Sequence, residues 1–416
     1  MLHADAIAEF KRGWRALVAS AVGNGSGLSG IPFYTFGVFV LPLATAFDWS
    51  RGQVSTAASF LILGTAITAP IIGTVIDKLG ARRVGIASML LLSVGYVLLT
   101  QINANIAVFY AAWLLMSLVG GGTTPVVWTR TVNIWFDKGR GLALGVALAG
   151  SGLAGVIAPV LTTKAILAFG WQGGYLAISA FIVFVAVPVL FLFFQERKLP
   201  AASHAADTPA LTTGSHGLAG LTLAESRTST AFWKIAIGFF FVSAVIAALI
   251  INLVPLLIDR GLPQVEAAKV ASIMGTAVLI GRVGIGYLLD RFSAPKVARL
   301  LLGLSAIGCL MLSVQGTPQW VVALSVISLG FAAAAEVDLL AFLTSRFFGM
   351  KSYGKIYGLQ LTAFYLGASL GPLCAGLAYD AFGNYLPTLY FAALSLLFGA
   401  VVIGTLGKAP DFGGGH

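Results

Sequence analysis

The chain has 416 residues, of which 58% are hydrophobic and only 10% are Asp, Glu, Lys or Arg. Soluble domains carry roughly 25% charged residues, so this composition excludes a protein whose whole surface faces water. The composition also excludes a disordered chain, a collagen-like chain and a disulfide scaffold. The net charge of +10 would indicate nucleic-acid binding only if the basic residues shared one exposed face.

Apolar runs long enough to cross a bilayer recur along the whole chain. A hydrocarbon core about 30 Å thick takes roughly 20 apolar residues per helix. The first predicted spans cover 15–46, 52–76, 84–101, 106–134, 141–168 and 172–194. The second set covers 232–258, 265–289, 297–315, 319–345, 354–379 and 385–407. The runs lack the alternation of a membrane barrel, so we expect an all-α membrane protein with twelve transmembrane helices and no cleaved signal.

The basic residues predict how these spans are oriented. If the amino terminus is cytoplasmic, only four of the 25 Lys and Arg fall on the opposite side: Arg51, Lys164, Arg260 and Lys269. Two more lie within spans and the other nineteen are cytoplasmic, as the positive-inside rule expects. We therefore expect a multi-pass protein of the cell (inner) membrane with both termini in the cytoplasm, and no nucleic-acid partner.

The two sets of spans are related to each other. Residues 199–230 form a long polar stretch that reads as a cytoplasmic linker between an N-terminal bundle, 1–198, and a C-terminal bundle, 231–416. When the sequence of the first bundle is shifted by 213 positions and aligned with the second, Gly73 pairs with Gly286, Asp77 with Asp290, Lys138 with Lys351, and Pro159 with Pro372. Parallel repeats with a substrate site at their interface are a transporter design.

The loop after the second span carries a charged motif. It reads Gly73-Thr-Val-Ile-Asp77-Lys78-Leu-Gly80-Ala-Arg82-Arg83, with a degenerate copy at Asp290 and Arg291. This resembles the signature loop of the major facilitator superfamily, which implies two pseudo-symmetric six-helix bundles. Asp77 with Arg82 and Arg83, and Asp290 with Arg291, then form a gate latch at the cytoplasmic seam. The alternative is ordinary loop charge that fixes topology.

A second motif begins the fifth span. The stretch from Trp135 to Gly150, with Phe169-Gly170-Trp171 at the end of the span, resembles the monocarboxylate transporter family, which includes the oxalate/formate exchangers. Near the first span that family carries an Asp-Gly-Gly-Trp-Gly-Trp-like stretch. This sequence departs from it and has only Gly13-Trp14 at that place. The resemblance implies transport of monocarboxylates.

Four ionisable residues remain within the spans: Arg130, Arg282, Glu336 and Asp338. Each costs at least a few kcal/mol near the bilayer centre unless it faces a cavity or a partner. Arg282 carries a planar fork that matches a carboxylate in bidentate fashion, and the resembled family has a substrate-binding arginine in the eighth span. The alternative for Arg282 is a structural ion pair with either acid. Arg130 either snorkels to the surface or offers a second cationic contact.

Glu336 and Asp338 are candidates for proton coupling. Burial favours the neutral carboxyl and a nearby arginine favours the ion, so a residue balanced between the two exchanges a proton as substrate binds. The alternative is a structural acid paired to Arg346 or Arg282. Further polar groups that could line a cavity are Asn24, Tyr34, Asn252 and Tyr365, and Tyr365 is the first choice to share a carboxylate with Arg282.

The sequence thus predicts a secondary transporter rather than an enzyme. Its expected cargo is a small organic anion, coupled to a proton or exchanged for a counter-anion, and we expect a monomer without metal or cofactor. The alternatives are proton-driven efflux of lipophilic compounds and a transporter-like receptor without net flux.

Overall fold

The computed structural model describes residues 4–136, 140–195, 220–349 and 351–410, and nearly all of these are helical. The first helices are α1 (Ala4–Ser26), α2 (Ile31–Phe47), α3 (Arg51–Leu79), α4 (Ala81–Leu99), α5 (Ile106–Val119), α6 (Pro125–Trp135), α7 (Arg140–Phe181) and α8 (Val187–Phe193). Two short turns accompany them, η1 (Gly120–Thr123) and η2 (Ile182–Ala186). The later helices are α9 (Leu223–Thr228), α10 (Thr230–Asp259), α11 (Gln264–Arg291), α12 (Ala294–Ser313), α13 (Gln319–Phe348), α14 (Tyr353–Phe382) and α15 (Leu386–Gly404).

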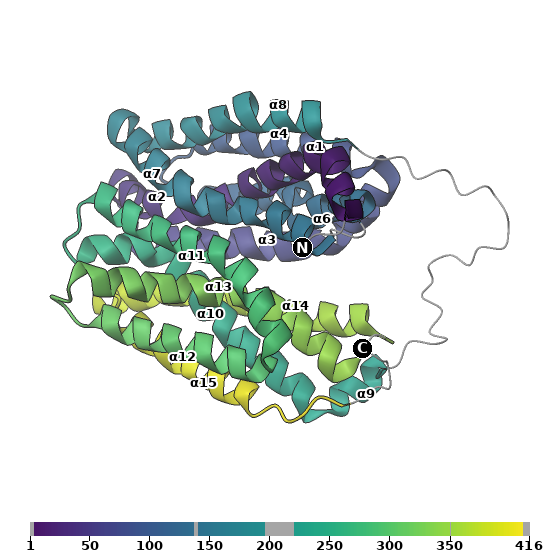
Figure 1. The fold of residues 1–416 in the computed structure, drawn as a ribbon. Helices are drawn as coiled ribbons and strands as arrows, with labels where there is room; N and C mark the ends of the chain where they lie inside the picture. The colour runs from purple at the N-terminus through teal and green to yellow at the C-terminus, as the bar shows by residue number, and fades with distance from the viewer. Residues whose placement is uncertain (1–3, 137–139, 196–219, 350, 411–416) are drawn as a thin grey trace.

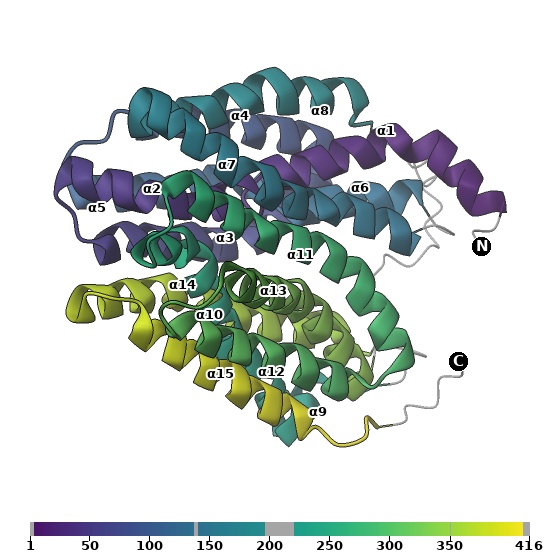
Figure 2. The same cartoon turned by 60° about the vertical axis from the view of Figure 1, so that its left-hand side comes forward.

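The long helices run side by side. We call residues 4–195 the N-half and residues 220–410 the C-half. Figure 1 shows the purple-to-teal helices of the N-half above the green-to-yellow helices of the C-half, and Figure 2 shows the same division after rotation. The two halves meet chiefly where α3 packs on α14, α7 on α11, and α2 on α10. In both views the start of α1 and the end of α15 lie toward the same end of the helices.

Hydropathy identifies the helices that are suited to a bilayer. Within the described residues, nine helical stretches are long and apolar enough to cross a membrane. The stretch Leu142–Phe193 contains the most apolar 18-residue window, with a mean hydropathy of 2.9. Many large apolar side chains on these helices are exposed, including Phe184, Leu394 and Leu161. A polytopic membrane protein accounts for this surface, because hydrocarbon rather than water then covers it.

Two predicted spans are broken in the structure. The range 15–46 is divided between α1 and α2, and the range 106–134 is divided at the turn η1. Glycines and a following proline favour the break in each case, at Gly27–Gly30 before Pro32 and at Gly120–Gly122 before Pro125. The breaks also contact each other, since the Leu28 amide donates a hydrogen bond of 3.1 Å to the Thr123 hydroxyl. This bond gives the Leu28 amide, which is freed by the break in the helix, a partner inside the protein. Backbone groups at membrane depth need such partners because no water reaches them.

The fifth and sixth predicted spans are joined in α7. Gly170 has φ of 74° and ψ of 178°, so the helix turns sharply at this residue. Positive φ is readily available only to glycine, which explains the residue found at the bend. The bend divides α7 into a first leg, 140–169, and a second leg, 171–181.

Aromatic side chains fill the core of the N-half. Phe39 stacks on Tyr175 with ring centroids 4.0 Å apart, and Phe36 packs on Trp113 at 5.0 Å. All four side chains are almost fully buried. This packing fixes α2 against α5 and α7, and it therefore positions Tyr34 on the same helix.

Candidate functional site

The structure brings together three of the four ionisable side chains predicted within spans. Arg282 lies on α11, and Glu336 and Asp338 lie on α13, which packs along α11. Arg282 is close enough to both carboxyl groups to interact with them electrostatically. The fourth residue, Arg130, is exposed on α6. The C-half therefore places one cation beside two acids.

Two tyrosines join this group. Tyr34, on α2 of the N-half, is within electrostatic range of Arg282 and Glu336. Tyr365, on α14, is within range of Glu336. We call Tyr34, Arg282, Glu336, Asp338 and Tyr365 the interface cluster, because its members come from both halves. Three of the four helices concerned, α2, α11 and α14, take part in the packing between the halves.

Glycines permit the close packing of helices around the interface cluster. A Cβ atom added to Gly281 would lie 2.8 Å from the Ala334 Cβ, so α11 and α13 touch directly beside Arg282 and Glu336. Larger residues at this contact would separate the cation from the acid. The glycine next to Arg282 thus sets the spacing of the cluster.

A second close contact brings the N-half to the cluster. A Cβ atom on Gly155 of α7 would lie 3.0 Å from the Gly275 Cα and 3.1 Å from Cδ1 of Tyr34. The first leg of α7 can therefore approach α11 while the Tyr34 ring packs against it. This contact holds the phenol of one half near the charged groups of the other.

Part of the interface cluster is unsatisfied. Arg282 Nε and Glu336 Oε2 are buried atoms without a hydrogen-bond partner among the described residues. Within that same part of the chain, no ion pair of 4.0 Å or less joins Arg282 to Glu336 or Asp338. Buried polar atoms are nearly always paired, so an unpaired donor beside an unpaired acceptor points to a site for a polar ligand.

The two predicted asparagines lie in helix contacts. Asn24 donates from Nδ2 to the Leu148 carbonyl at 3.1 Å and so joins α1 to α7, while its Oδ1 has no partner among the described residues. Asn252 accepts from the Ser55 hydroxyl at 2.9 Å and from the Tyr385 hydroxyl at 3.3 Å. In this conformation Asn252 therefore joins α3 of the N-half to the C-half.

The predicted cytoplasmic gate is only partly visible. Three of its side chains lie outside the described residues: Asp77, Asp290 and Arg291. Arg82 donates a hydrogen bond of 2.6 Å to the Phe191 carbonyl, and its guanidinium lies 5.5 Å from the centre of the Phe191 ring. Arg83 is exposed. Arg82 thus ties the start of α4 to α8.

Polar contacts join the halves at the end of the molecule where α3 begins. Arg51 Nη1 lies 2.8 Å from both carboxylate oxygens of Asp259, at the end of α10. Asp380, near the end of α14, accepts from the Ser50 hydroxyl and, at 3.0 Å, from the Gly52 amide. We call Ser50, Arg51, Gly52, Asp259 and Asp380 the end cluster.

Backbone packing continues the end cluster. A Cβ atom on Gly52 would lie 2.6 Å from the Gly376 carbonyl oxygen, so α3 and α14 are in direct backbone contact. The Arg51 guanidinium also lies 4.4 Å from the centre of the Tyr379 ring. At this end the two halves are closed against each other.

The sequence did not single out the end cluster. Its residues are separated by as many as 330 positions, and no local motif connects them. One signal was present: Arg51 is among the few basic residues on the side that the charge count leaves poor in cations, and Asp259 and Asp380 end predicted spans on that side. Opposite charges at span ends facing the same side are candidates for such contacts.

Comparisons with known proteins show which family the sequence matches. The sequence model of the Major Facilitator Superfamily matches residues 22–372 and 285–412. An uncharacterized MFS-type transporter, YhjX, of Escherichia coli (strain K12) is 24% identical over 346 residues, which are 82% of each protein. Monocarboxylate transporter 13 of Bos taurus is 28% identical, covering 95% of this chain and 89% of that protein. Monocarboxylate transporter 11 of Homo sapiens is 25% identical over 96% of this chain and 85% of that protein.

A solved structure has a similar fold. It is the crystal structure of a bacterial homologue of the human lysosomal transporter Spinster, in an inward-facing and unoccupied conformation. The TM-score is 0.67 with 16% sequence identity, over 94% of this chain and 95% of that one. This likeness concerns the arrangement of helices.

Proposed function

This chain belongs to the major facilitator superfamily, and we propose that it is a secondary active transporter of small organic anions, above all monocarboxylates. Its relatives are transporters, so it is a membrane transporter and not an enzyme. The choice of cargo rests on one observation: the Nε of Arg282 is buried at the contact between the halves and has no hydrogen-bond partner among the described residues. The names of the monocarboxylate transporter relatives support the same class of cargo.

Arg282 is the proposed anchor for the substrate carboxylate. A guanidinium donates two parallel hydrogen bonds to a carboxylate, and such charge-assisted bonds are roughly twice as strong as neutral ones. Tyr34 and Tyr365 would hold the same anion from the N-half and from α14. Asn24 and Asn252 complete the proposed set as polar groups that are released when helices move.

Glu336 and Asp338 are the proposed proton-coupling groups. A substrate anion beside Arg282 would leave one cation facing three negative charges if both acids were ionised, and an uncompensated buried charge is costly. A proton taken up with the substrate offsets the negative charge that the substrate adds, so the net charge of the site stays as it was before binding. Exchange of one anion for another at Arg282 is the alternative form of coupling, because the charge at the site then stays constant.

Alternating access would use the two ends of the molecule in turn. We propose that the end cluster closes the extracellular side and that this conformation is inward-facing. Asp77, Arg82, Arg83, Asp290 and Arg291 would close the cytoplasmic side in the opposite conformation. Each set would join charged groups across the seam between the halves in its own conformation, and these contacts would break as the halves rock.

The proposed architecture follows the predicted spans. Twelve transmembrane helices would form two pseudo-symmetric six-helix bundles, 1–198 and 231–416, joined by the cytoplasmic linker 199–230. The location is the cell (inner) membrane, with both termini in the cytoplasm, and the protein would act as a monomer. The distribution of Lys and Arg supports this orientation.

Removing the coupling acids should uncouple transport from the proton gradient. In proteoliposomes, the wild type should accumulate labelled pyruvate about tenfold for each pH unit of an inwardly directed proton gradient, as one-to-one coupling requires. Glu336→Gln and Asp338→Asn should lose this accumulation and retain pyruvate–pyruvate exchange. Liposomes without protein correct for diffusion of the neutral acid.

The same assay can contradict the proposed coupling. If both single variants accumulate pyruvate like the wild type, neither acid carries the proton. If wild-type uptake ignores the gradient but requires an internal anion, exchange is the mechanism.

A further inference from the structure

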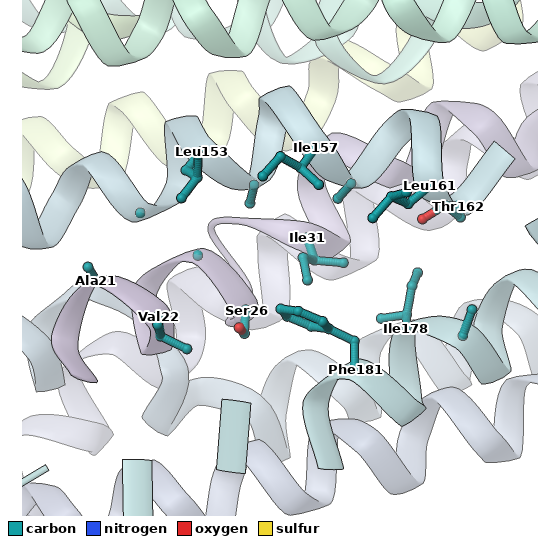
Figure 3. A pocket seen from close by; sticks show the side chains of 15 residues that line it. Ala21, Val22, Ser26, Ile31, Leu153, Ile157, Leu161, Thr162, Ile178 and Phe181 are labelled. Carbon is teal, nitrogen blue, oxygen red and sulfur yellow. The ribbon is translucent and has the colours of Figure 1, made fainter. Parts of the chain in front are cut away.

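A cavity lies in the N-half, apart from the interface cluster. Its volume is about 330 Å³, and it is bounded by α1, the start of α2 and the two legs of α7. We call it the α1–α7 groove. Figure 3 shows Leu153, Ile157 and Leu161 along the first leg of α7, with Phe181 of the second leg opposite them and Ile31 between.

The lining of the α1–α7 groove is almost entirely apolar. Its polar side chains are Ser26 and Thr162, which are 2% and 4% exposed. A buried water needs two to four polar partners, so water is a poor occupant for a cavity of this kind. The chemistry of the lining therefore selects a hydrocarbon.

The α1–α7 groove opens on an exposed apolar face. Leu153 is 51% exposed and Leu161 is 58% exposed. Both lie on the first leg of α7, within the candidate membrane-spanning stretch Leu142–Phe193. In a bilayer, lipid chains surround this face. A concave surface among them offers one chain more contacts than the convex faces around it, since dispersion attraction depends on the number of neighbouring atoms.

At the floor of the groove, α1 packs directly against the first leg of α7. A Cβ atom on Gly25 of α1 would lie 2.6 Å from the Gly150 carbonyl oxygen on α7, so these backbones touch. Ser26 ends α1 there, and α2 begins at Ile31. An occupant of the groove therefore rests against the break between α1 and α2. Tyr34 lies in the first turn of α2, directly after this break.

From these observations we propose that the α1–α7 groove is a binding site for one hydrocarbon chain of a membrane phospholipid. The chain enters from the bilayer and packs between the two legs of α7, against the break that separates α1 from α2. The site is separate from the interface cluster, and no carboxylate or other charged group takes part in it.

Photocrosslinking tests the site directly. The probe is a phosphatidylcholine with a diazirine in one acyl chain, reconstituted with the full chain in proteoliposomes and mapped by mass spectrometry. Labelling of Leu153, Ile157 and Phe181 should exceed labelling of Leu394 by about tenfold, although Leu394 is equally apolar and 66% exposed on α15. Equal labelling of the groove and of Leu394 would overturn the proposal.

A matched pair of variants adds a second test. Ala177 lines the groove, whereas Ala180 is exposed on the same leg of α7 outside it. Ala177→Phe should reduce labelling of the groove about tenfold by filling it, and Ala180→Phe should leave it unchanged. Undiminished labelling in Ala177→Phe would contradict the proposal, as would protein–protein crosslinks from the groove, which would indicate a second copy. The comparison with Leu394 in the wild type remains decisive if Ala177→Phe does not fold. None of these readouts depends on transport.

Discussion

Arg282→Ala should reduce the initial rate of pyruvate uptake into proteoliposomes by about a hundredfold. Removing one member of a buried charge contact costs roughly 2 to 5 kcal/mol, and about 2.8 kcal/mol corresponds to this factor. The loss would arise because the substrate carboxylate no longer has a cation to offset its desolvation. Glu336 and Asp338 would then repel the anion without opposition.

Arg282→Lys separates charge from geometry. Lysine retains the cation and loses the planar fork, so we expect roughly tenfold weaker apparent affinity with measurable uptake. Arg299→Ala serves as the matched control, because Arg299 is an exposed arginine of the C-half on α12. Normal transport by Arg282→Lys would show that bidentate binding is not required. An equal loss in Arg299→Ala would show that the effect is not specific to the interface cluster.

Gly52→Ala should prevent the end cluster from closing. The added methyl group would meet the Gly376 carbonyl oxygen at 2.6 Å, which a backbone atom cannot avoid without movement of α14. Asp380 would also lose its place beside the Gly52 amide. We therefore expect the conformational equilibrium to shift by about tenfold or more toward the state that is open at this end, which corresponds to 1.4 kcal/mol.

Cysteine labelling measures this shift. The reporter is Ser55→Cys, at a position that is fully buried between the halves, in a chain in which Cys309 and Cys374 are replaced by serine. An impermeant maleimide should label the reporter about tenfold faster in Gly52→Ala than in Gly303→Ala. Gly303 is the control because a Cβ atom there has nothing within 4 Å. Equal rates in the two variants would show that the end cluster is not a gate.

Hydropathy predicted the long helices well. The predicted range 232–258 corresponds to α10 (Thr230–Asp259), and the range 319–345 corresponds to α13 (Gln319–Phe348). The resemblance to the major facilitator superfamily is confirmed by the family match over residues 22–372. These features follow from composition, span length and local motifs, which are all carried by contiguous sequence.

Features that depend on packing were harder to predict. The break between α1 and α2 was not predicted because glycine and serine are nearly neutral in hydropathy, so a short turn of these residues does not interrupt a long apolar run. The bend at Gly170 was expected only as a loop between two spans. In each case the signal was the clustering of glycine, and its meaning depends on which helix packs against it.

The interface cluster was predicted in part. Arg282, Glu336 and Asp338 were singled out because charges within spans are costly, and the structure places them together. Tyr34 was expected only as a general cavity residue, and Tyr365 as a partner of Arg282 in holding a carboxylate. The proximity of both tyrosines to Glu336 was not predicted, because it depends on how α2 and α14 meet α13. Asn252 was expected to line a cavity because it is a polar residue within a span. In this conformation its side chain instead accepts a hydrogen bond from Ser55 of the other half.

Ligand-induced thermal stabilisation tests the central claim most directly, that Arg282 binds a small carboxylate. Purified protein is heated with matched pairs of acid and amide, such as pyruvate with pyruvamide and propionate with propionamide. A ligand at a hundredfold excess over its Kd stabilises the folded state by about 2.7 kcal/mol, so the acid that binds should raise the Tm clearly while its amide does not. Arg282→Ala should abolish the rise. Equal stabilisation by acid and amide, or a rise that persists in Arg282→Ala, would contradict the account.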